Sequence, residues 1–230
     1  MPVLYLYTKV KCPAESDLTR LDRVMGFINL TKHKRRLISR DENMEKFFEF
    51  IDVSFSVHDD GKGHTGLVKM WGNVAVAMVS KKQKIGTKDS TESEMVALTD
   101  MIEKVEWVHE YSKEQGYEIK IPVIYEDNTS TIALVMKDNN PKLRTRHLTA
   151  RRCIASEFIV KDKKASIEFK KTTEMLADTL TKPVVGHLFY KLNNIMMGWL
   201  KLWPAQSIRV KGVRWKNRDV GVGSPAENNN

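Results

Sequence analysis

Four acidic residues, far apart in the chain, have the type and placement that metal-dependent chemistry requires. With the phrases that contain them, they are Asp52 in Phe-Ile-Asp-Val-Ser, Glu94 in Ser-Thr-Glu-Ser-Glu-Met, Asp127 in Tyr-Glu-Asp-Asn and Asp178 in Leu-Ala-Asp-Thr-Leu-Thr-Lys. Carboxylates at the ends of strands and the starts of helices can converge in a fold, and four of them can hold two hard divalent cations. Two cations about 4 Å apart can clamp the attacking and leaving oxygens of a phosphodiester. The four residues therefore suggest a two-metal site for phosphodiester cleavage.

Each acid also has an ordinary structural explanation when it is considered alone. Asp52 could be a polar residue on the exposed face of a half-buried strand, although a carboxylate in so apolar a stretch is costly without a partner. Glu94 could compensate the dipole at the start of a helix, and Glu92 competes with it for either role. Asp127 could cap the following helix, and Asp178 could be a surface acid. Only the combination of the four argues for a site.

The elements that would position these acids follow from the apolar spacing and the turn residues. We expect helices over 14–30, 90–115, 128–135, 147–162, 173–182 and 186–199, and strands over 47–57, 65–70, 73–79, 121–126 and 165–170. Ser16 is expected to cap the first helix, and Ser90 or Thr91 the second. Three antiparallel strands followed by alternating helices and strands predict an α/β fold, with a mixed sheet and helices on its faces.

Composition and charge narrow the class of protein. The 230 residues are 41% hydrophobic, and no apolar run is long enough to span a bilayer. Cys12 and Cys153 are too few and too far apart for a disulfide framework or a zinc site, so we expect an intracellular protein. The net charge is +9, and residues 1–40 and 201–230 carry most of it. Basic ends around acidic phrases suit a polyanionic substrate, although a solvated basic surface would look the same.

Several phrases resemble the ribonuclease H domain of the Pol polyproteins of copia-type LTR retrotransposons. The matching segments are Ser90–Leu98, Tyr125–Ile132, Arg144–His147 and Ala177–Pro183, where the family usually reads S-T-E-A-E-Y-x-A-L, Y-x-D-N-x-S-A-I, R-T-K-H and A-D-x-L-T-K-P. Residues 80–83, Ser-Lys-Lys-Gln, also resemble the family's S-K-K-Q at the end of the third strand. The match covers about residues 48–198, with the motifs in order.

This resemblance implies a ribonuclease H-like fold, with a five-stranded mixed sheet of three antiparallel strands followed by parallel strands, and helices on both faces. It places the four catalytic, metal-binding acids of the family on Asp52, Glu94, Asp127 and Asp178. Glu94 is preferred to Glu92 because the family's glutamate directly precedes an aromatic or apolar residue, here Met95. The implied cofactor is Mg²⁺, as two ions, with Mn²⁺ as a substitute. The implied activity is cleavage of the RNA strand of an RNA–DNA hybrid, leaving a 3′-hydroxyl.

The resemblance also implies what surrounds the domain. Residues 10–31 resemble the segment that follows the reverse transcriptase catalytic domain, so we expect residues 1–45 to be a helical remnant of that connection region. Residues 46–200 are expected to form the ribonuclease H-like domain, and residues 201–230 a basic, disordered tail. The expected partners are an RNA–DNA hybrid and the reverse transcriptase domain of the same polyprotein. The expected location is the cytoplasm, in a virus-like particle, or the nucleus, with no membrane partner and no predicted oligomeric state.

A set of polar and basic residues is expected to contact the nucleic acid. Its members are Lys81, Lys82, Lys84, Asn128, Ser130, Arg144, Arg146, His147 and Arg151. The lysines end a predicted strand and the arginines lie in a basic cluster, but a solvated connector and a charged helix face explain them equally well. His147 is not expected to bind a metal, because hard cations prefer oxygen ligands.

Two other functions fit parts of the pattern. A catalytically inactive, retroelement-derived module that binds nucleic acid or serves as a connection would keep the fold and lose the chemistry. The presence of all four acids favours an enzyme over that alternative. A transposase or integrase of the same fold is a third hypothesis, and the phrases around Glu94 and Asp178 argue against it.

Overall fold

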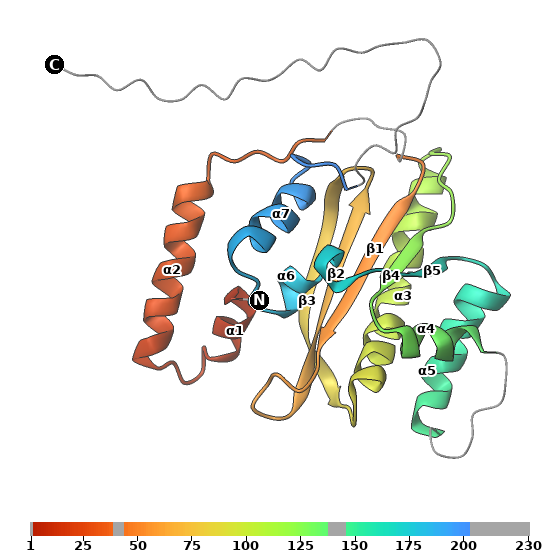
Figure 1. Ribbon diagram of the computed structural model, residues 1–230, viewed down its shortest axis with the longest axis horizontal. Coiled ribbons are helices and arrows are strands. Elements are labelled where there is room, and N and C mark those ends of the chain that lie inside the picture. The colour runs from red at the N-terminus through yellow and green to blue at the C-terminus, as the bar shows by residue number, and fades with distance from the viewer. Residues whose placement is uncertain (1, 39–43, 138–145, 203–230) are drawn as a thin grey trace, which may run out of the picture.

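The computed structural model describes residues 2–38, 44–137 and 146–202. Its helices and strands follow the predicted order (Figure 1). The strands are β1 (Phe47–Ser54), β2 (Lys62–Trp71), β3 (Val74–Gly86), β4 (Val123–Glu126) and β5 (Ser166–Phe169). The α-helices are α1 (Pro2–Thr8), α2 (Glu15–Thr31), α3 (Ser90–Glu114), α4 (Thr129–Met136), α5 (Arg146–Ser156), α6 (Asp178–Thr181) and α7 (Gly186–Met196). A π-helical turn, Glu157–Lys161, continues α5, and a 3₁₀ turn, Thr172–Glu174, precedes α6.

The five strands form one mixed sheet in the order β3-β2-β1-β4-β5. β1, β2 and β3 are antiparallel, whereas β4 and β5 are parallel to β1 and to each other. The register places Asp52 of β1 opposite Gly66 of β2. Gly72, in the turn between β2 and β3, has φ 59°, a left-handed conformation that favours glycine. The predicted α/β fold with three antiparallel strands followed by parallel ones is confirmed.

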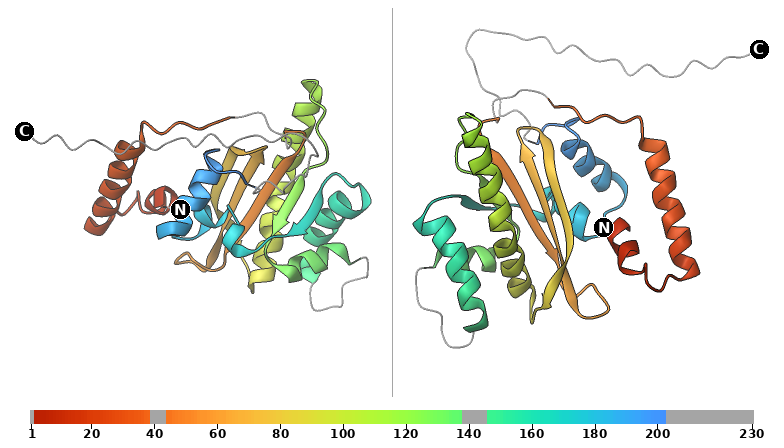
Figure 2. Two further views of the ribbon diagram at one scale, coloured as in Figure 1. Left: turned by 45° about the horizontal axis from the view of Figure 1, so that its top comes forward. Right: turned by 180° about the vertical axis from the view of Figure 1, so that it is seen from behind.

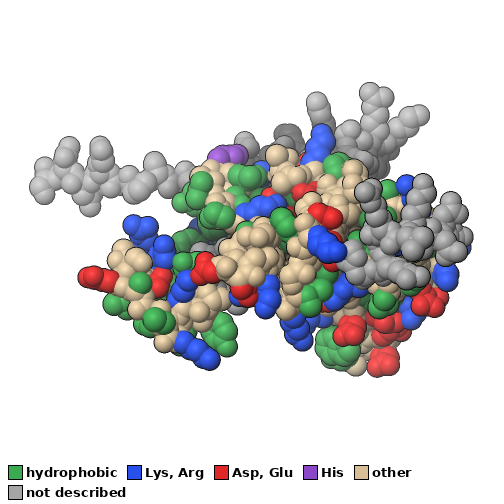
Figure 3. Space-filling view, turned by 90° about the horizontal axis from the view of Figure 1, so that it is seen from below, with side chains coloured by type: hydrophobic (Ala, Val, Ile, Leu, Met, Phe, Trp, Pro, Cys, Tyr) green, Lys and Arg blue, Asp and Glu red, His purple; other side chains and the backbone are tan. Residues whose placement is uncertain are grey.

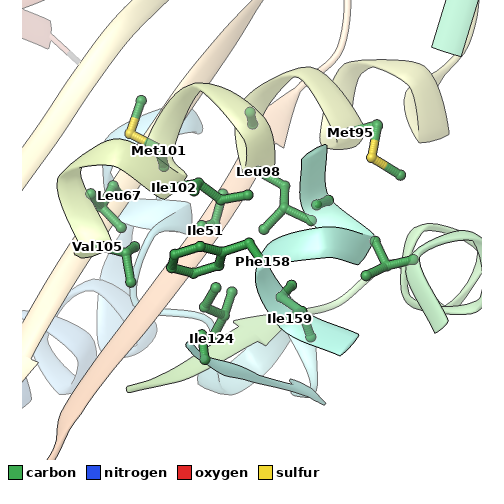
Figure 4. Packing of buried hydrophobic residues seen from close by; sticks show 14 of the residues in the cluster. Ile51, Leu67, Met95, Leu98, Met101, Ile102, Val105, Ile124, Phe158 and Ile159 are labelled. Carbon is green, nitrogen blue, oxygen red and sulfur yellow. The ribbon is translucent and has the colours of Figure 1, made fainter. Parts of the chain in front are cut away.

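Helices cover both faces of the sheet, because successive side chains of β1 point to opposite sides. On one face, Ile51 and Val53 pack with Leu98 of α3 and Phe158, which follows α5, in the cluster shown in Figure 4. On the other face, aromatic and aliphatic side chains of β1 and β2 pack against the segment 175–177 and α7. Figure 2 shows α3 crossing one face of the sheet, with α7 on the opposite face. The predicted helical layers on both faces are therefore present.

Acidic residues cap the two long helices, and the predicted serine and threonine caps are wrong. Asp89 precedes α3, and its side chain accepts a hydrogen bond from the backbone N–H of Glu92. Helix α2 begins at Glu15 after Ala14, and Asp17 accepts a hydrogen bond from the backbone N–H of Ala14. At the start of both helices an aspartate carboxylate accepts a hydrogen bond from a backbone N–H group, which is the role that the sequence assigned to hydroxyl groups.

Other boundaries differ from the predicted ones for physical reasons. Strand β3 extends to Gly86 because the lysine-rich half of an edge strand can pair on one side and leave its side chains in water. The predicted helix over 173–182 is instead a 3₁₀ turn followed by the four-residue α6. Lys182 ends α6 in an extended conformation, as expected of a residue before proline. Helix α1 was not predicted from the sequence.

Helices α1 and α2 lie beside α7, away from the sheet (Figure 1). Phe27 of α2 contacts Phe189 of α7 edge to face, with 6.1 Å between the ring centroids. Beyond α2, the backbone N–H of Leu37 donates to the carbonyl of Met197. None of the described helices combines the length and the apolar character that crossing a membrane requires. The predicted tail over 201–230 lies outside the described residues, except for its first two residues.

Candidate metal centre

Three of the four predicted acids converge at one end of the sheet. Carboxylate oxygens of Asp52, Glu94 and Asp127 all lie within 4.8 Å of one another. They come from β1, from the N-terminal part of α3 and from the residue after β4. This end of the sheet is the lower end in Figure 1, and Figure 3 views the molecule from that side. Acidic and basic side chains are intermixed on this face (Figure 3).

Asp52 is held from both sides by the segment that contains α6. The residue is 1% exposed and lies on β1, the middle strand of the sheet. The hydroxyl of Thr181 donates a hydrogen bond to its Oδ2, and Nζ of Lys182 lies 3.0 Å from its Oδ1. Ser54, two residues further along β1, donates to the carbonyl of Thr181 over 2.9 Å. These contacts orient the Asp52 carboxylate toward the cluster, and they explain how a strand this apolar accommodates an acid.

The close approach of α6 to the sheet depends on Gly66, the cross-strand neighbour of Asp52. A Cβ atom at this position would lie 2.8 Å from the Cγ2 atom of Thr181 and 3.0 Å from the carbonyl oxygen of Ala177. Both distances are shorter than ordinary contacts, so a side chain here would push α6 away. The absence of a side chain at Gly66 therefore lets Thr181 and Lys182 reach Asp52.

A buried network fixes the first turn of α3 and with it Glu94. The side-chain N–H₂ of Gln83 donates to Thr65 Oγ1 over 3.1 Å and to the carbonyl of Ser93 over 2.9 Å. The Ser93 hydroxyl donates back to Gln83 Oε1 over 2.9 Å. Gly63 leaves room for this network, since a Cβ there would lie 2.6 Å from Gln83 Oε1. The hairpin of β2 and β3 thus holds the residue directly before Glu94.

The same turn separates the roles of the two glutamates that compete in the sequence. Glu92 accepts a hydrogen bond from the backbone N–H of Lys88 over 2.8 Å, and it therefore takes part in the start of the helix. Glu94 is buried and contributes an oxygen to the carboxylate group, while its Oε2 has no hydrogen-bond partner. Of the two glutamates, Glu94 is the one that belongs to the carboxylate group, and its role as a metal ligand stays a prediction.

Asp127 follows β4, where the chain turns into α4. Its Oδ2 accepts a hydrogen bond from the Thr172 hydroxyl over 2.8 Å. The cap of α4 is Asn128, whose Oδ1 accepts from the backbone N–H groups of Ser130 and Thr131. Asp127 is therefore free of the capping role that the sequence left open for it.

Glu126 is a fourth carboxylate at this position, and sequence analysis did not select it. Its side chain is fully buried, and its Oε1 accepts from the backbone N–H of Asn128 over 3.1 Å, while Oε2 has no hydrogen-bond partner. The alternation of β4 places it on the α3 face, next to Glu94. The sequence signal that could have identified Glu126 is its position directly before Asp127, at the end of an apolar strand.

The electrostatics of the cluster disfavour charge on the buried acids. Burial, followed by the neighbouring carboxylate of Glu126, raises the pKa of Glu94 far above its ordinary value. Burial is also the largest cause that raises the pKa of Glu126 and of Asp52, although Lys182 opposes it at Asp52. Carboxylates that share a site behave in this way when no cation offsets their repulsion. The cluster therefore favours a proton or a cation.

Asp178, the fourth predicted acid, reaches the cluster indirectly. Its Oδ1 lies 2.9 Å from Nζ of Lys182, the same atom that contacts Asp52. Burial lowers the pKa of Lys182, but the two carboxylates outweigh it and raise that pKa above its ordinary value. A lysine cation thus joins the predicted acids of β1 and α6.

The donor set fits a hard divalent cation. Every candidate ligand in the group is a carboxylate oxygen, which is the type that Mg²⁺ and Mn²⁺ prefer. Oε2 of Glu94, buried and without a hydrogen-bond partner, is an orphaned acceptor of the kind that a cation satisfies.

Of the residues predicted to contact nucleic acid, some form ion pairs within the protein and others are exposed. Lys81 pairs with Asp100 over 3.3 Å and Lys82 with Asp60 over 2.8 Å, whereas Lys84 is exposed. Arg151 contacts Asp100 over 2.8 Å and the Thr99 hydroxyl over 2.6 Å, so it ties α5 to α3. Ser130 is exposed at the start of α4. Arg144 and the side chains of Arg146 and His147 lie outside the described residues. The contacts of all these residues with nucleic acid stay predictions.

The fold and site together define an α/β protein with a carboxylate cluster where β1 and β4 end and α3 begins. The sheet order and the helices on both faces are those of the ribonuclease H-like fold that the motifs implied.

No protein-family model matches the chain. The retrovirus-related Pol polyprotein from transposon RE1 of Arabidopsis thaliana is 26% identical over 179 residues, which cover 75% of this chain and 12% of the relative. This similarity confirms the resemblance to a retrotransposon Pol polyprotein, of which the chain spans about an eighth.

Solved structures that resemble the chain include ribonucleases H. Ribonuclease H1 from the archaeon Halobacterium salinarum has a TM-score of 0.43 and 17% identity, and the match covers 59% of this chain and 93% of that one. A foamy viral protease-reverse transcriptase, solved in complex with an RNA/DNA hybrid, has a TM-score of 0.44 and 14% identity, covering 64% of this chain and 21% of that one.

Proposed function

We propose that this chain is a metal-dependent endonuclease that cleaves the RNA strand of RNA–DNA hybrids during retrotransposon reverse transcription. The observation that carries the proposal is the convergence of Asp52, Glu94 and Asp127, with an unpaired, buried oxygen on Glu94. The similarity to a retrotransposon Pol polyprotein supports the choice of substrate, because reverse transcription produces such hybrids.

The four acids would share one task in this enzyme, which is to hold the metal ions. Asp52, Glu94, Asp127 and Asp178 would bind two Mg²⁺ ions, and bound Mg²⁺ would supply activation of water and charge stabilisation at the phosphodiester. Thr181 orients the Asp52 carboxylate, and Thr172 orients that of Asp127. The hybrid would be recognised through its shape and the 2′-hydroxyls of the RNA rather than through its base sequence.

We also infer the organisation of the chain. Residues 46–200 would form the catalytic module, since the sheet, both cores and the carboxylate cluster lie within them. Residues 1–45 would connect it to the reverse transcriptase domain of the same polyprotein. This division agrees with the position of α2 beside α7, away from the sheet.

A cleavage assay with matched variants tests the proposal. The parent protein, Asp127→Asn and Asp162→Asn are incubated with an end-labelled RNA–DNA hybrid and Mg²⁺. Asp162 is an exposed acid after the π-helical turn, so its variant makes the same chemical change outside the cluster. We expect cleavage of the RNA strand by the parent and by Asp162→Asn, and a loss of at least a hundredfold in Asp127→Asn.

Other outcomes of this assay are equally informative. Equal cleavage by the parent and Asp127→Asn would exclude the cluster as the active site. A folded parent that binds the hybrid in a salt-sensitive manner without cutting it would favour the alternative, an inactive retroelement-derived module that binds nucleic acid.

A further inference from the structure

The side chain of Lys182 lies at the edge of the acidic cluster, between two of the four predicted metal ligands. Nζ of Lys182 is 3.0 Å from Asp52 Oδ1 and 2.9 Å from Asp178 Oδ1. Lys182 directly follows the single turn of α6 and is four residues after Asp178, and the two side chains lie within contact distance. A lysine thus contacts two of the four acids that are predicted to bind the metal.

The two sides of this contact differ in how firmly they are held. The side chains of Asp52 and Asp178 are 1% and 6% exposed, whereas that of Lys182 is 37% exposed. The other oxygen of Asp52 is fixed by the Thr181 hydroxyl. A lysine ammonium sits on a flexible four-carbon stem and is readily solvated. The carboxylates are therefore the rigid partners, and the ammonium is the partner that can leave.

We propose that Lys182 is a displaceable counter-ion, which neutralises Asp52 and Asp178 in the metal-free protein and competes with a divalent metal ion for them. The inference rests on the proposed metal site and says how that site is held until it is loaded. Without the ammonium, the negative charges of Asp52 and Asp178 would lie unneutralised near the buried acids Glu94 and Glu126. The need to displace the ammonium lowers the affinity for the metal, and the presence of the ammonium preserves the folded site in the metal-free protein.

Removal of the charge on Lys182 should therefore strengthen metal binding and weaken the metal-free protein. The variant Lys182→Met keeps an unbranched apolar stem of nearly the same length without the ammonium. We expect the Kd for Mn²⁺ to fall about tenfold, since two charge-assisted contacts no longer have to be broken. We expect a lower Tm than the parent in EDTA and a larger increase in Tm on addition of Mn²⁺, because ligand binding stabilises the folded state.

The measurement uses the full chain and no nucleic acid. Mn²⁺ binding is followed by electron paramagnetic resonance and by calorimetry for the parent, Lys182→Met, Lys182→Arg and Lys164→Met. Lys182→Arg keeps the charge and should bind no more tightly than the parent. Lys164→Met removes the same charge from an ion pair with Glu106, and it should leave the Kd within twofold. If Lys182→Met fails to fold, Lys182→Gln takes its place.

The outcomes separate this inference from the proposed function. A Kd for Lys182→Met that is unchanged or weaker than that of the parent overturns the competition, whether or not the parent cleaves a hybrid. A parent that binds no Mn²⁺ overturns it as well. Tighter Mn²⁺ binding by Lys182→Met, together with a parent protein that never cuts the hybrid, would support the competition and contradict the nuclease.

Discussion

The buried amide of Gln83 offers the sharpest test of how the fold positions Glu94. Its side chain makes three hydrogen bonds, two as donor and one as acceptor, to Thr65 and Ser93. The variant Gln83→Met has a similar volume and removes all three. We expect the first turn of α3 to loosen from the hairpin of β2 and β3, and Glu94 to lose its fixed position.

The size of the effect follows from the groups that the variant leaves behind. Thr65 and Ser93 are fully buried, so water cannot replace the lost partners without entering the core. A buried polar group without a partner costs about 1–3 kcal/mol. Because the two hydroxyls can rotate toward other acceptors, we expect the three losses to sum to about 3 kcal/mol of unfolding free energy. This is a large part of the stability of an ordinary domain.

Three measurements check this prediction. Urea unfolding in EDTA gives the loss of stability, hydrogen exchange reports the amides of residues 90–96, and cleavage of the hybrid reports the site. Gln115→Met, a change at an exposed position after α3, is the matched control and should match the parent. Ordinary surface substitutions change the free energy of unfolding by no more than about 0.5 kcal/mol. If Gln83→Met changes it by no more than this, and the amides of Ser93 and Glu94 exchange no faster than in the parent, the network does not position Glu94.

Two further predictions concern the packing and the pH dependence of the same region. Gly66→Ala should lower the free energy of unfolding in urea by about 1–3 kcal/mol and slow cleavage, because its Cβ meets a backbone carbonyl of the α6 segment at 3.0 Å. Gly86→Ala is the control and should be neutral, because nothing lies within 4 Å of its Cβ. Equal effects of the two variants would contradict the close approach of α6 to Gly66. Burial, with a smaller contribution from His58, lowers the pKa of His64 from 6.5 to about 4, so the unfolded chain takes up a proton on this side chain before the folded protein does. The contribution of His64 to stability should therefore fall by about 2 kcal/mol between pH 7 and pH 5, and His64→Gln should lack this part of the pH dependence in urea unfolding; identical pH profiles would refute it.

The order and type of the elements could be predicted from the sequence because they depend on local patterns. Apolar residues at helical spacing in 90–115 and the β-prone run that begins at Phe47 predicted α3 and β1 closely. The late segment could not be predicted in the same way. Its turns depend on the burial of residues 175–177 against the sheet and on the contact with Gly66, far away in the sequence.

The sequence by itself determined which acids were candidates, and the motifs around Glu94, Asp127 and Asp178 pointed to the ribonuclease H resemblance. Only the tertiary structure decided how they meet. Glu92 and Glu94 both lie near the start of α3, and they differ because Glu94 joins the acids of β1 and β4 while Glu92 accepts a backbone N–H. The burial of Glu126 depends in the same way on the packing of the folded sheet against α3. Likewise, the bridge from Asp52 to Lys182 joins residues 130 positions apart, so it exists only once α6 packs onto the sheet.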